Sequence, residues 1–369
     1  MYFRDIIGQE AQKNLLRQLV KNNRIPHAQL LLGPQGSGGL PLAVAFAQYV
    51  LCENRSEADA CGVCSSCHKI SRFVHPDVHY SYPSVGTKKI STDFVAEWRR
   101  AMEENPYMHI NQWLQSIDAE NKQGNINVDE CQAIVRKLSL KTFEAKYKIL
   151  IMWLPEYLGK EGNRLLKLIE EPPDNTLFLL VAENQELILN TVLSRCQLIK
   201  IQPLSSGEVA EGLQRFKGVD AVRAQVVAHL SDGNLSEALQ MIGSSENDNA
   251  NFFLDWLRRC YKGWGPDLLA WTEQFSTIGR ESQKYFLRYG LHFLREYTLL
   301  KCTGNPTLLK LLPKELETAQ NLTKVIQLEQ IDDIMQLFND LTTHVERNAN
   351  PKILFLDASI RLSHILKGK

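Results

Sequence analysis

The sequence predicts an α/β domain built on a parallel sheet, followed by regions that are entirely helical. From Met1 to about Pro203, short apolar runs alternate with helical patterns, which is typical of a parallel sheet with crossover helices. A glycine-rich stretch follows one of these apolar runs and precedes a helical pattern. Beyond Pro203 the apolar residues keep a helical spacing without clear strand patterns.

Five apolar runs are the expected strands of the first region. A helix is expected from about Leu40 to Cys52, and Pro41 is tolerated in its first turn because the N–H that proline lacks has no partner there. The strands are expected at Ala28–Leu32, Val78–Tyr82, Lys148–Leu154, Thr176–Ala182 and Leu198–Ile201.

The remaining chain is expected to form two helical domains. Ser205 or Ser206 is expected to cap the first helix of the smaller one, because their hydroxyl groups can accept a backbone N–H. Its helices are expected at Glu208–Phe216, Asp220–Leu230 and Leu235–Ile242. The polar stretch Gly243–Asn251 is expected to be a linker. Long helices are then expected at Tyr285–Leu300 and Ile331–Val345.

These patterns suggest three domains. The first covers residues 1–203 and contains an insertion at about 83–127, which holds Trp98, Trp113 and a polar stretch that ends near Gly124. The second covers residues 204–243 and the third residues 244–369.

Composition narrows the functional classes. The 369 residues include 42 Lys plus Arg and 42 Asp plus Glu, so the net charge is zero and binding of nucleic acid through bulk positive charge is disfavoured. No apolar run approaches the length of about 18 residues that a membrane span needs, and Met1–Leu19 lacks a signal region. We therefore expect a cytoplasmic protein whose eight cysteines stay reduced.

Residues 33–40 read Gly-Pro-Gln-Gly-Ser-Gly-Gly-Leu and keep the frame of a phosphate-binding loop, G-x-x-x-x-G-K-[ST]. Gly39 stands at the position of the lysine that reaches the terminal phosphates, and Leu40 at that of the hydroxyl that holds Mg²⁺. ATP is therefore expected not to be hydrolysed and not to be bound. An ordinary flexible turn between strand and helix is the alternative. The candidate nucleotide-binding residues are Gly33, Gly36, Gly38 and Gly39.

The acidic pair of a phosphate-loop ATPase is also missing. Such enzymes carry an Asp, often followed by Glu, at the end of a later strand. The apolar run that begins at Lys148 ends in Trp153 and Leu154 at these positions, and Glu156 beyond them is expected to be a solvated or structural carboxylate. The alternative is that another strand is the relevant one.

Four cysteines have the spacing of a metal site. Cys52, Cys61, Cys64 and Cys67 follow the pattern C-x₈-C-x₂-C-x₂-C. Four thiolates in a cytosolic chain favour tetrahedral Zn²⁺ in a closed, structural site. A redox pair or reduced surface thiols are the alternatives.

Arg195 lies in the sequence Ser194-Arg195-Cys196, directly before the last strand. An arginine at a domain edge can act as a finger in the ATP site of a neighbouring subunit. On its own, an ordinary surface or salt-bridged arginine is the more common situation.

Taken together, the motifs resemble those of bacterial DNA polymerase III clamp-loader subunits of the AAA+ class. They occur in the same order over about the first 200 residues, and jointly they are specific. They are Asp5-Ile6-Ile7-Gly8-Gln9-Glu10, Pro26-His27-Ala28, the glycine loop, the four cysteines, His75-Pro76-Asp77, Leu165-Leu166-Lys167-Leu168-Ile169-Glu170-Glu171-Pro172-Pro173 and Ser194-Arg195-Cys196.

The resemblance implies a RecA-like AAA+ domain with a zinc module, a helical lid and a helical collar that mediates oligomerisation. It favours the non-hydrolysing delta-prime branch of the family, because the chain departs from the motor subunits at three places. These are Gly39 and Leu40 in the loop, Trp153 and Leu154 at the strand end, and Ser236 near the position of the family's sensor arginine. It also implies that Arg195 is an arginine finger in trans, and that the partners are the gamma/tau and delta subunits. The β sliding clamp and primed DNA would be engaged through the assembled complex, at the nucleoid-associated replisome.

Two rival functions remain. The first is an ATP-hydrolysing motor subunit of the gamma/tau type with a degenerate site. The second is a zinc-dependent nucleic-acid-binding module that uses Lys88, Lys89 and nearby aromatic residues, against which the balanced charge argues.

Overall fold

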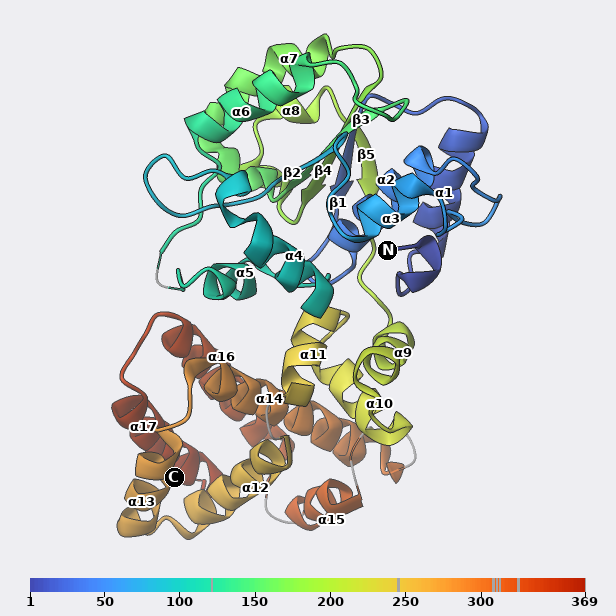
Figure 1. Cartoon of the computed structure of the whole chain (residues 1–369). Coiled ribbons are helices and arrows are strands. Elements are labelled where there is room, and N and C mark those ends of the chain that lie inside the picture. The colour runs from blue at the N-terminus through green and yellow to red at the C-terminus, as the bar shows by residue number, and fades with distance from the viewer. Residues whose placement is uncertain are drawn as a thin grey trace. The chain divides into compact units, whose positions relative to one another are not determined.

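The computed structural model describes residues 1–120, 122–243, 246–306, 309, 311, 313–323 and 326–368. The chain divides into two compact units, Met1–Glu237 and Ala238–Lys369. Each unit is described by itself, with elements labelled as in Figure 1.

The first unit contains a five-stranded parallel sheet with the strand order β2-β3-β4-β1-β5. Every predicted strand is present, and its ends lie within one residue of the expected ones. The α/β class of RecA-like type is thereby confirmed. The strands are β1 Ala28–Leu32, β2 Val78–Ser81, β3 Lys148–Trp153, β4 Thr176–Ala182 and β5 Gln197–Lys200.

Helices connect the strands of this sheet. The predicted helix after the glycine loop is confirmed as α2. The helical elements outside the insertion are η1 Phe3–Asp5, α1 Glu10–Lys21, α2 Gly39–Leu51, α3 Ser65–Ser71, α6 Val128–Ser139, η3 Pro155–Leu165, α7 Leu166–Glu170, η4 Gln185–Leu187 and α8 Asn190–Leu193.

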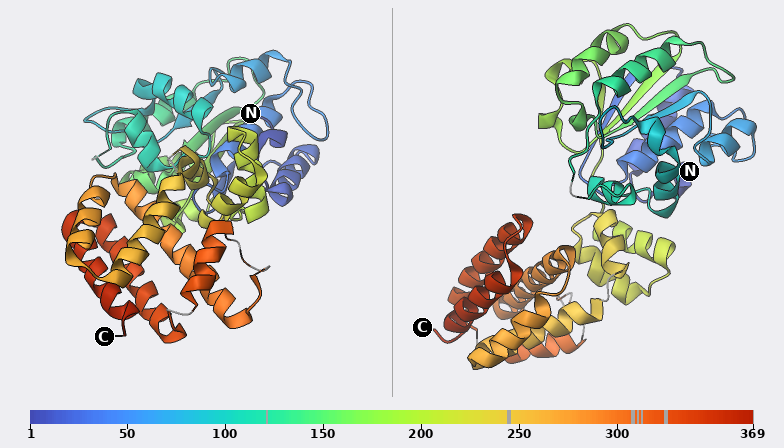
Figure 2. Two further views of the ribbon diagram at one scale, coloured as in Figure 1. Left: turned by 90° about the horizontal axis from the view of Figure 1, so that it is seen from below. Right: turned by 60° about the vertical axis from the view of Figure 1, so that its left-hand side comes forward.

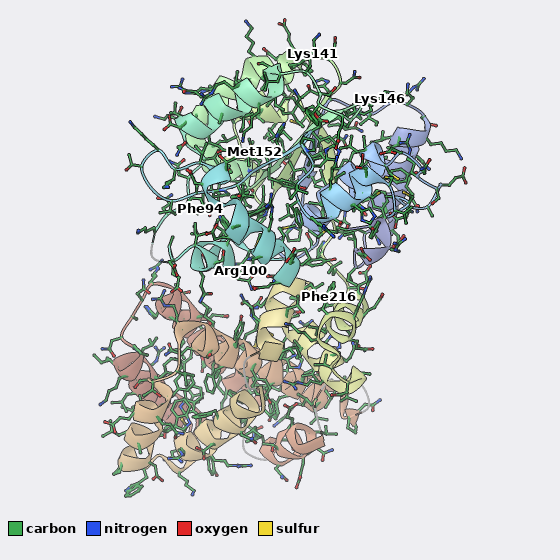
Figure 3. All side chains as sticks on the ribbon, in the orientation of Figure 1. Phe94, Arg100, Lys141, Lys146, Met152 and Phe216 are labelled. Atoms are coloured by element: carbon green, nitrogen blue, oxygen red, sulfur yellow. The ribbon has the colours of Figure 1, made fainter. Side chains whose placement is uncertain are left out.

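The strands are buried on both faces, as expected for a parallel sheet. Residues such as Leu31 face α1 and α2, while alternate residues such as Leu30 and Met152 face α6, α7 and α8. Figure 3 shows Met152 in the interior, whereas Lys141 and Lys146 lie at the periphery. This burial explains why the strands read as continuous apolar runs.

The insertion at residues 83–127 is helical and packs on the sheet, which the sequence did not reveal. It forms η2 Ser91–Phe94, α4 Val95–Glu104 and α5 Ile110–Ser116. The Trp98 ring stacks on Tyr82 with 4.0 Å between centroids, and lies 5.3 Å from Trp113 and 5.6 Å from Trp153. The aromatic cluster therefore fixes the insertion against the end of β3.

Three short helices follow the sheet, as predicted: α9 Ser206–Lys217, α10 Ala221–Leu230 and α11 Leu235–Gly243. Ser205 is the cap of α9, and a capping box holds it in place. The Glu208 N–H donates to Ser205 Oγ at 3.3 Å, and the Ser205 N–H donates to Glu208 Oε2 at 2.7 Å. Because α11 crosses the division between the two units, the boundary at residue 243 stays a prediction.

The described residues of the second unit form helices and no strands. Figure 2 shows these helices from two further directions. They are α12 Glu246–Lys262, α13 Gly265–Phe275, α14 Arg280–Thr303, α15 Pro313–Leu322, α16 Leu328–Glu346 and α17 Pro351–Leu366. The two long helices expected from the sequence are confirmed as parts of α14 and α16. An aromatic core, in which Trp256 stacks on Trp271 at 5.3 Å, holds the unit together.

The linker predicted at Gly243–Asn251 is largely wrong. Helix α12 begins at Glu246, while residues 244 and 245 lie outside the described residues. Asn, Asp and Glu occur at helix beginnings as well as in linkers, because their side chains can accept free backbone N–H groups there. Composition alone therefore did not distinguish the beginning of a helix from a linker.

None of the helices in the described part of the chain combines the length and apolarity that crossing a lipid bilayer requires.

Candidate functional site

The glycine loop joins β1 to α2 and has the backbone of a phosphate-binding loop. The Gly33 N–H donates to Ala182 O at 3.1 Å, which ties the loop to β4. Gly36 and Gly38 have φ values of 71° and 94°, in the region that favours glycine. Gly39 is the first residue of α2, so the loop leads into a helix N-terminus as the motif requires.

Side chains fill the space in front of this loop. The remaining cavity has a volume of about 30 Å³, and its lining includes Leu40, Tyr107 and Trp153. Small-molecule sites commonly measure about 300 Å³ or more. A Cβ atom at Gly38 would lie 2.9 Å from Tyr107 Cε1. The space in front of the loop is therefore much smaller than a typical small-molecule site.

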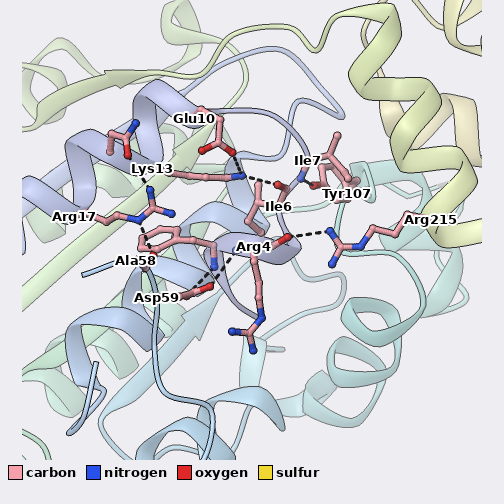
Figure 4. Close-up of polar contacts among 12 residues, drawn as sticks. Arg4, Ile6, Ile7, Glu10, Lys13, Arg17, Ala58, Asp59, Tyr107 and Arg215 are labelled. Atoms are coloured by element: carbon pink, nitrogen blue, oxygen red, sulfur yellow. Dashed lines mark hydrogen bonds and ion pairs between the residues drawn. The ribbon is translucent and has the colours of Figure 1, made fainter. Parts of the chain in front are cut away.

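Tyr107 comes from the insertion and is fixed by a polar contact. Its hydroxyl oxygen accepts the Ile7 N–H at 2.9 Å, as Figure 4 shows. The side chain is buried, and burial raises the pKa of the Tyr107 hydroxyl. The ring therefore stays neutral and in place beside the loop.

Gln9 closes the loop from a second side. Its amide Nε2 donates to Ser37 O at 3.1 Å and to Gln202 O at 2.6 Å, while its Oε1 accepts the Gln202 N–H at 3.2 Å. The buried amide thus links the glycine loop to the segment that follows β5.

The three short helices α9, α10 and α11, which we call the lid, close the loop from a third side. A Cβ atom at Gly36 would lie only 1.9 Å from Asn234 Oδ1, and the Leu235 N–H donates to Gly36 O at 3.3 Å. Ser236, at the expected position of the sensor arginine, is buried and donates to Gln112 Oε1 at 3.0 Å. Contacts within the protein therefore occupy the side of the lid that faces the loop.

The end of β3 presents no carboxylate to the loop. Trp153 is buried and lines the loop cavity, but so do Val181, Ala182 and Glu183 at the end of β4, so the choice of β3 as the relevant strand stays a prediction. Glu156 is structural, since its Oε1 accepts the N–H groups of Glu183 at 2.5 Å and Asn184 at 2.8 Å. Burial raises the pKa of Glu156. Desolvation at the rim of the cavity, and then the charge of Glu156, raise the pKa of Glu183 to about 7.

The four predicted cysteines come together. Their sulfur atoms all lie within 4.8 Å of one another, and Cys61 Sγ is 4.0 Å from Cys67 Sγ. Zn–S bonds of about 2.3 Å in a tetrahedron place sulfur atoms about 3.8 Å apart, so the cluster fits one ion. Backbone N–H groups of Val63 and Cys64 lower the pKa of Cys61 to about 6, whereas burial raises the pKa of Cys52 and of Cys67, so a bound cation would have to stabilise the thiolate forms of those two. All eight cysteines are free thiols.

The cysteine module is tied to the N-terminal segment. Asp59, which lies between the first and second cysteine, accepts the N–H groups of Phe3 and Arg4, each at 3.1 Å. Arg215 of α9 donates to Arg4 O at 2.9 Å, as Figure 4 shows. The short helix η1 therefore connects the cysteine module to the lid.

The His75-Pro76-Asp77 motif has a structural role. The Asp77 carboxylate accepts the N–H groups of Phe143, Glu144 and Ala145 at 2.6 to 2.9 Å. Burial opposes the charge, but these N–H groups outweigh it and lower the pKa of Asp77. The motif fixes the loop between α6 and β3.

Arg195 follows α8 at the end of the sheet and is salt-bridged. Its Nε donates to Glu170 Oε1 at 2.6 Å, and its second terminal nitrogen also contacts this oxygen. The first terminal nitrogen donates to Thr191 O at 2.6 Å and to Ser194 Oγ at 3.2 Å. The side chain remains 32% exposed. In the chain by itself Arg195 is thus a salt-bridged surface arginine, and its role in the ATP site of a neighbouring subunit stays a prediction.

Sequence reasoning missed several residues that shape these sites. Tyr107 lies in the insertion, where no periodic pattern marks it, and Asn234 lies between two expected helices, where the sequence assigns it no role. Gln9 and Glu170 belong to motifs that were recognised, but neither had been assigned a role. Their positions in those motifs were the available signal.

Comparison with known proteins agrees with these features. A family model described as "DNA polymerase III, delta subunit" matches residues 8–205. The chain is similar to DNA polymerase III subunit tau of Bacillus subtilis, with 26% identity over 248 residues that cover 65% of this chain and 37% of tau. It is also similar to DNA polymerase III subunit delta' of the same organism, with 25% identity over 236 residues that cover 63% of this chain and 58% of delta'. The matches thus span less than two thirds of these relatives.

Among solved structures, a DNA polymerase III gamma subunit-related protein from Thermotoga maritima aligns over 95% of this chain and 99% of its own, at 14% identity and a TM-score of 0.43. This score is too low to support an argument, so the assignment rests on the family model. Because that model matches more than half of the 369 residues, the chain belongs to the DNA polymerase III delta-subunit family, whose members are clamp-loader proteins.

Proposed function

We propose that this chain is a delta-prime-like stator of the DNA polymerase III clamp loader. It does not bind or hydrolyse ATP, and it acts as a rigid member of the assembly that places the β sliding clamp on primed DNA. The observation that supports the proposal is the small cavity of about 30 Å³ at the glycine loop, with Tyr107 and Trp153 in its lining and Asn234 packed against Gly36. The missing lysine at Gly39 and the missing hydroxyl at Leu40 support it.

Equilibrium binding of fluorescent ATP to the purified chain tests the first part. We expect no saturable Mg²⁺-dependent binding and no turnover by the chain alone. The rival reading as a gamma/tau-like motor predicts both. Saturable binding followed by hydrolysis would therefore establish the rival.

Arg195 is proposed to be the arginine finger for a neighbouring motor subunit. Its guanidinium lies at the edge of the sheet domain and is partly exposed. A finger supplied in trans speeds phosphoryl transfer by roughly 10³-fold or more, because it stabilises the charge that develops on the phosphoryl oxygens.

The test is Arg195→Ala in a loader reconstituted with gamma/tau and delta subunits. We expect the DNA-stimulated burst of ATP hydrolysis to lose the contribution of the motor subunit whose ATP site faces this chain. Arg164→Ala is the matched control, because Arg164 is also paired with a glutamate on the surface of the same unit, at 2.6 Å from Glu161. An unchanged burst with Arg195→Ala would refute the role.

The ion held by Cys52, Cys61, Cys64 and Cys67 is proposed to be structural Zn²⁺. The four sulfur ligands leave no open position for a reacting water. Elemental analysis should give one zinc per chain, and Cys61→Ser should lower this content. Retention of a full equivalent of zinc by that variant would contradict the four-thiolate site.

The helical unit after the lid is proposed to be the collar that binds sister subunits. The three-domain division at residues 203 and 243 belongs to this proposal, as does a cytoplasmic location at the replisome. Co-purification of the chain with gamma/tau and delta subunits tests the assembly. Removal of residues 244–369 should abolish co-purification, whereas retention of the partners by the truncated chain would exclude the collar role.

A further inference from the structure

The contacts of Arg195 nearly exhaust its capacity to donate hydrogen bonds. The guanidinium makes four hydrogen bonds, two to one oxygen of Glu170, one to Thr191 O and one to Ser194 Oγ. An arginine side chain has five N–H donors. In this arrangement it cannot offer two free, parallel N–H groups to an outside anion.

The edge of the guanidinium that Glu170 occupies is one that a phosphate would use. Arginine binds phosphate and carboxylate groups in the same way, through two parallel N–H groups of its planar fork. In Arg195 the Nε and the second terminal nitrogen form such an edge, and both point to Glu170 Oε1. A phosphate can take this edge only if the carboxylate leaves it.

We infer that Glu170 is a latch on Arg195. In the free chain the carboxylate holds the guanidinium against α7 and α8, and in the assembled loader the terminal phosphate of the neighbour's nucleotide replaces the carboxylate. This inference rests on the proposed finger role and adds its regulation. Glu170 acts through Arg195 and does not itself touch the nucleotide.

The strength of the ion pair suits a latch. The side chains of Arg195 and Glu170 are 32% and 43% exposed, and ion pairs at such exposure hold weakly because water screens them. A phosphate carries more negative charge than a carboxylate and can compete for the same donors.

The other edge of Arg195 gives the released side chain a pivot. Thr191 and Ser194 belong to the same segment as Arg195, and they bind its first terminal nitrogen independently of Glu170. When the carboxylate leaves, the guanidinium keeps this attachment and turns its free edge outward.

The isolated chain allows a test that does not depend on ATP hydrolysis. Phenylglyoxal modifies free guanidinium groups, and peptide mass spectrometry can follow the modification of Arg195 with time. Glu170→Gln should speed this modification by about two- to five-fold, the range expected for one exposed ion pair. Raising the salt concentration should speed the reaction of Arg195 with phenylglyoxal in the wild-type chain and have little effect in Glu170→Gln.

Glu171→Gln is the matched control. It removes the same charge one residue later, while the bonds of Arg195 go to Glu170, Thr191 and Ser194. In this variant Arg195 should react with phenylglyoxal at the same rate as in the wild-type chain. Equal rates for Glu170→Gln and Glu171→Gln would overturn the latch.

The assembled loader supplies the second test. Glu170→Gln should speed the ATP burst at the site facing Arg195 by about two- to five-fold, because the finger no longer has to be released. A slower or unchanged burst would overturn the latch. Arg195→Ala in the same assay tests the finger separately from the latch. If this variant loses the burst, the finger role is supported even when the results for Glu170→Gln exclude the latch.

Discussion

The glycine loop and the edge around Arg195 belong to the same sheet domain but are built in opposite ways. The loop is covered by buried side chains, Tyr107 and Trp153 among them, and has a cavity of about 30 Å³. At the edge, the partly exposed guanidinium of Arg195 donates four hydrogen bonds to neighbouring oxygen atoms. Packing determines the shape of the first region, and charge determines that of the second.

Substitutions in the two regions are therefore expected to have different consequences. Filling a site with aromatic rings makes its shape part of the hydrophobic core, so changes there should alter stability. A weakly paired surface cation contributes little to stability, so its ion pair can be broken without disturbing the core. Changes in the two regions should therefore be read out by different measurements.

The largest expected effect comes from Trp153→Asp, which restores a carboxylate at the end of β3. The variant removes a buried ring that contacts Trp98 at 5.6 Å and buries a charge, so we expect a loss of about 4 kcal/mol or more in the free energy of unfolding. Urea denaturation followed by circular dichroism measures it. Trp264→Asp is the control, because that side chain is 60% exposed and its loss should change little. A stable Trp153→Asp variant that binds Mg²⁺-ATP would break the comparison.

Gly36→Ala comes next and probes the contact between loop and lid. Its Cβ would lie 1.9 Å from Asn234 Oδ1 at a φ of 71°, so we expect a loss of about 2–3 kcal/mol. Gly218→Ala is the matched control, since Gly218 has a left-handed backbone with φ 63° and ψ 22° but its Cβ would meet no atom within 4 Å. That variant should lose about 1 kcal/mol.

A double-mutant cycle refines the Gly36 result. In an Asn234→Ala background the amide oxygen is absent, so Gly36→Ala should lose less than it does alone. Strictly additive losses would mean that the lid does not press on the loop, and the account of a loop closed by packing would then fail at this point.

The smallest expected effect is the pH dependence of Glu183→Gln. The pKa of Glu183 is raised to about 7 in the folded chain, so the fold favours its protonated form. Its favourable contribution is present below the unfolded pKa of about 4.3 and is lost as the pH rises through 7. Glu183→Gln should therefore raise the melting temperature by about 2 °C at pH 8 and leave it unchanged near pH 4, after allowance for screening of this partly exposed group.

Glu186→Gln serves as the control for this measurement, because Glu186 is an exposed neighbour outside the cavity lining. It should show no gain at pH 8. A gain of equal size in both variants would point to the net charge of the chain instead of the rim of the cavity.

Much of the fold could be predicted because its signals are local. The strands read as apolar runs, the spacing of the cysteines was a few residues, and the Ser205 cap lies three residues from its partner Glu208. The glycine loop was visible as a motif directly after β1. Such signals need only neighbouring residues, so the sequence contains them in readable form.

The remaining features depend on contacts between distant segments. Tyr107 reaches the loop from an insertion about 70 residues later in the chain, and Glu170 pairs with Arg195 across 25 residues. Side chains that fill a cavity need only the right size and position, and many residue types satisfy that condition. Without the fold, nothing distinguished Tyr107 from the other aromatic residues of the insertion.

The closed loop also limits how this chain can change over generations. A Cβ atom at position 39 would lie 3.1 Å from Val181 Cγ1, and the cavity beyond it, lined by Tyr107 and Trp153, measures only about 30 Å³. A lysine introduced there would therefore meet buried side chains of the core. Opening this loop to a larger ligand would require several replacements together.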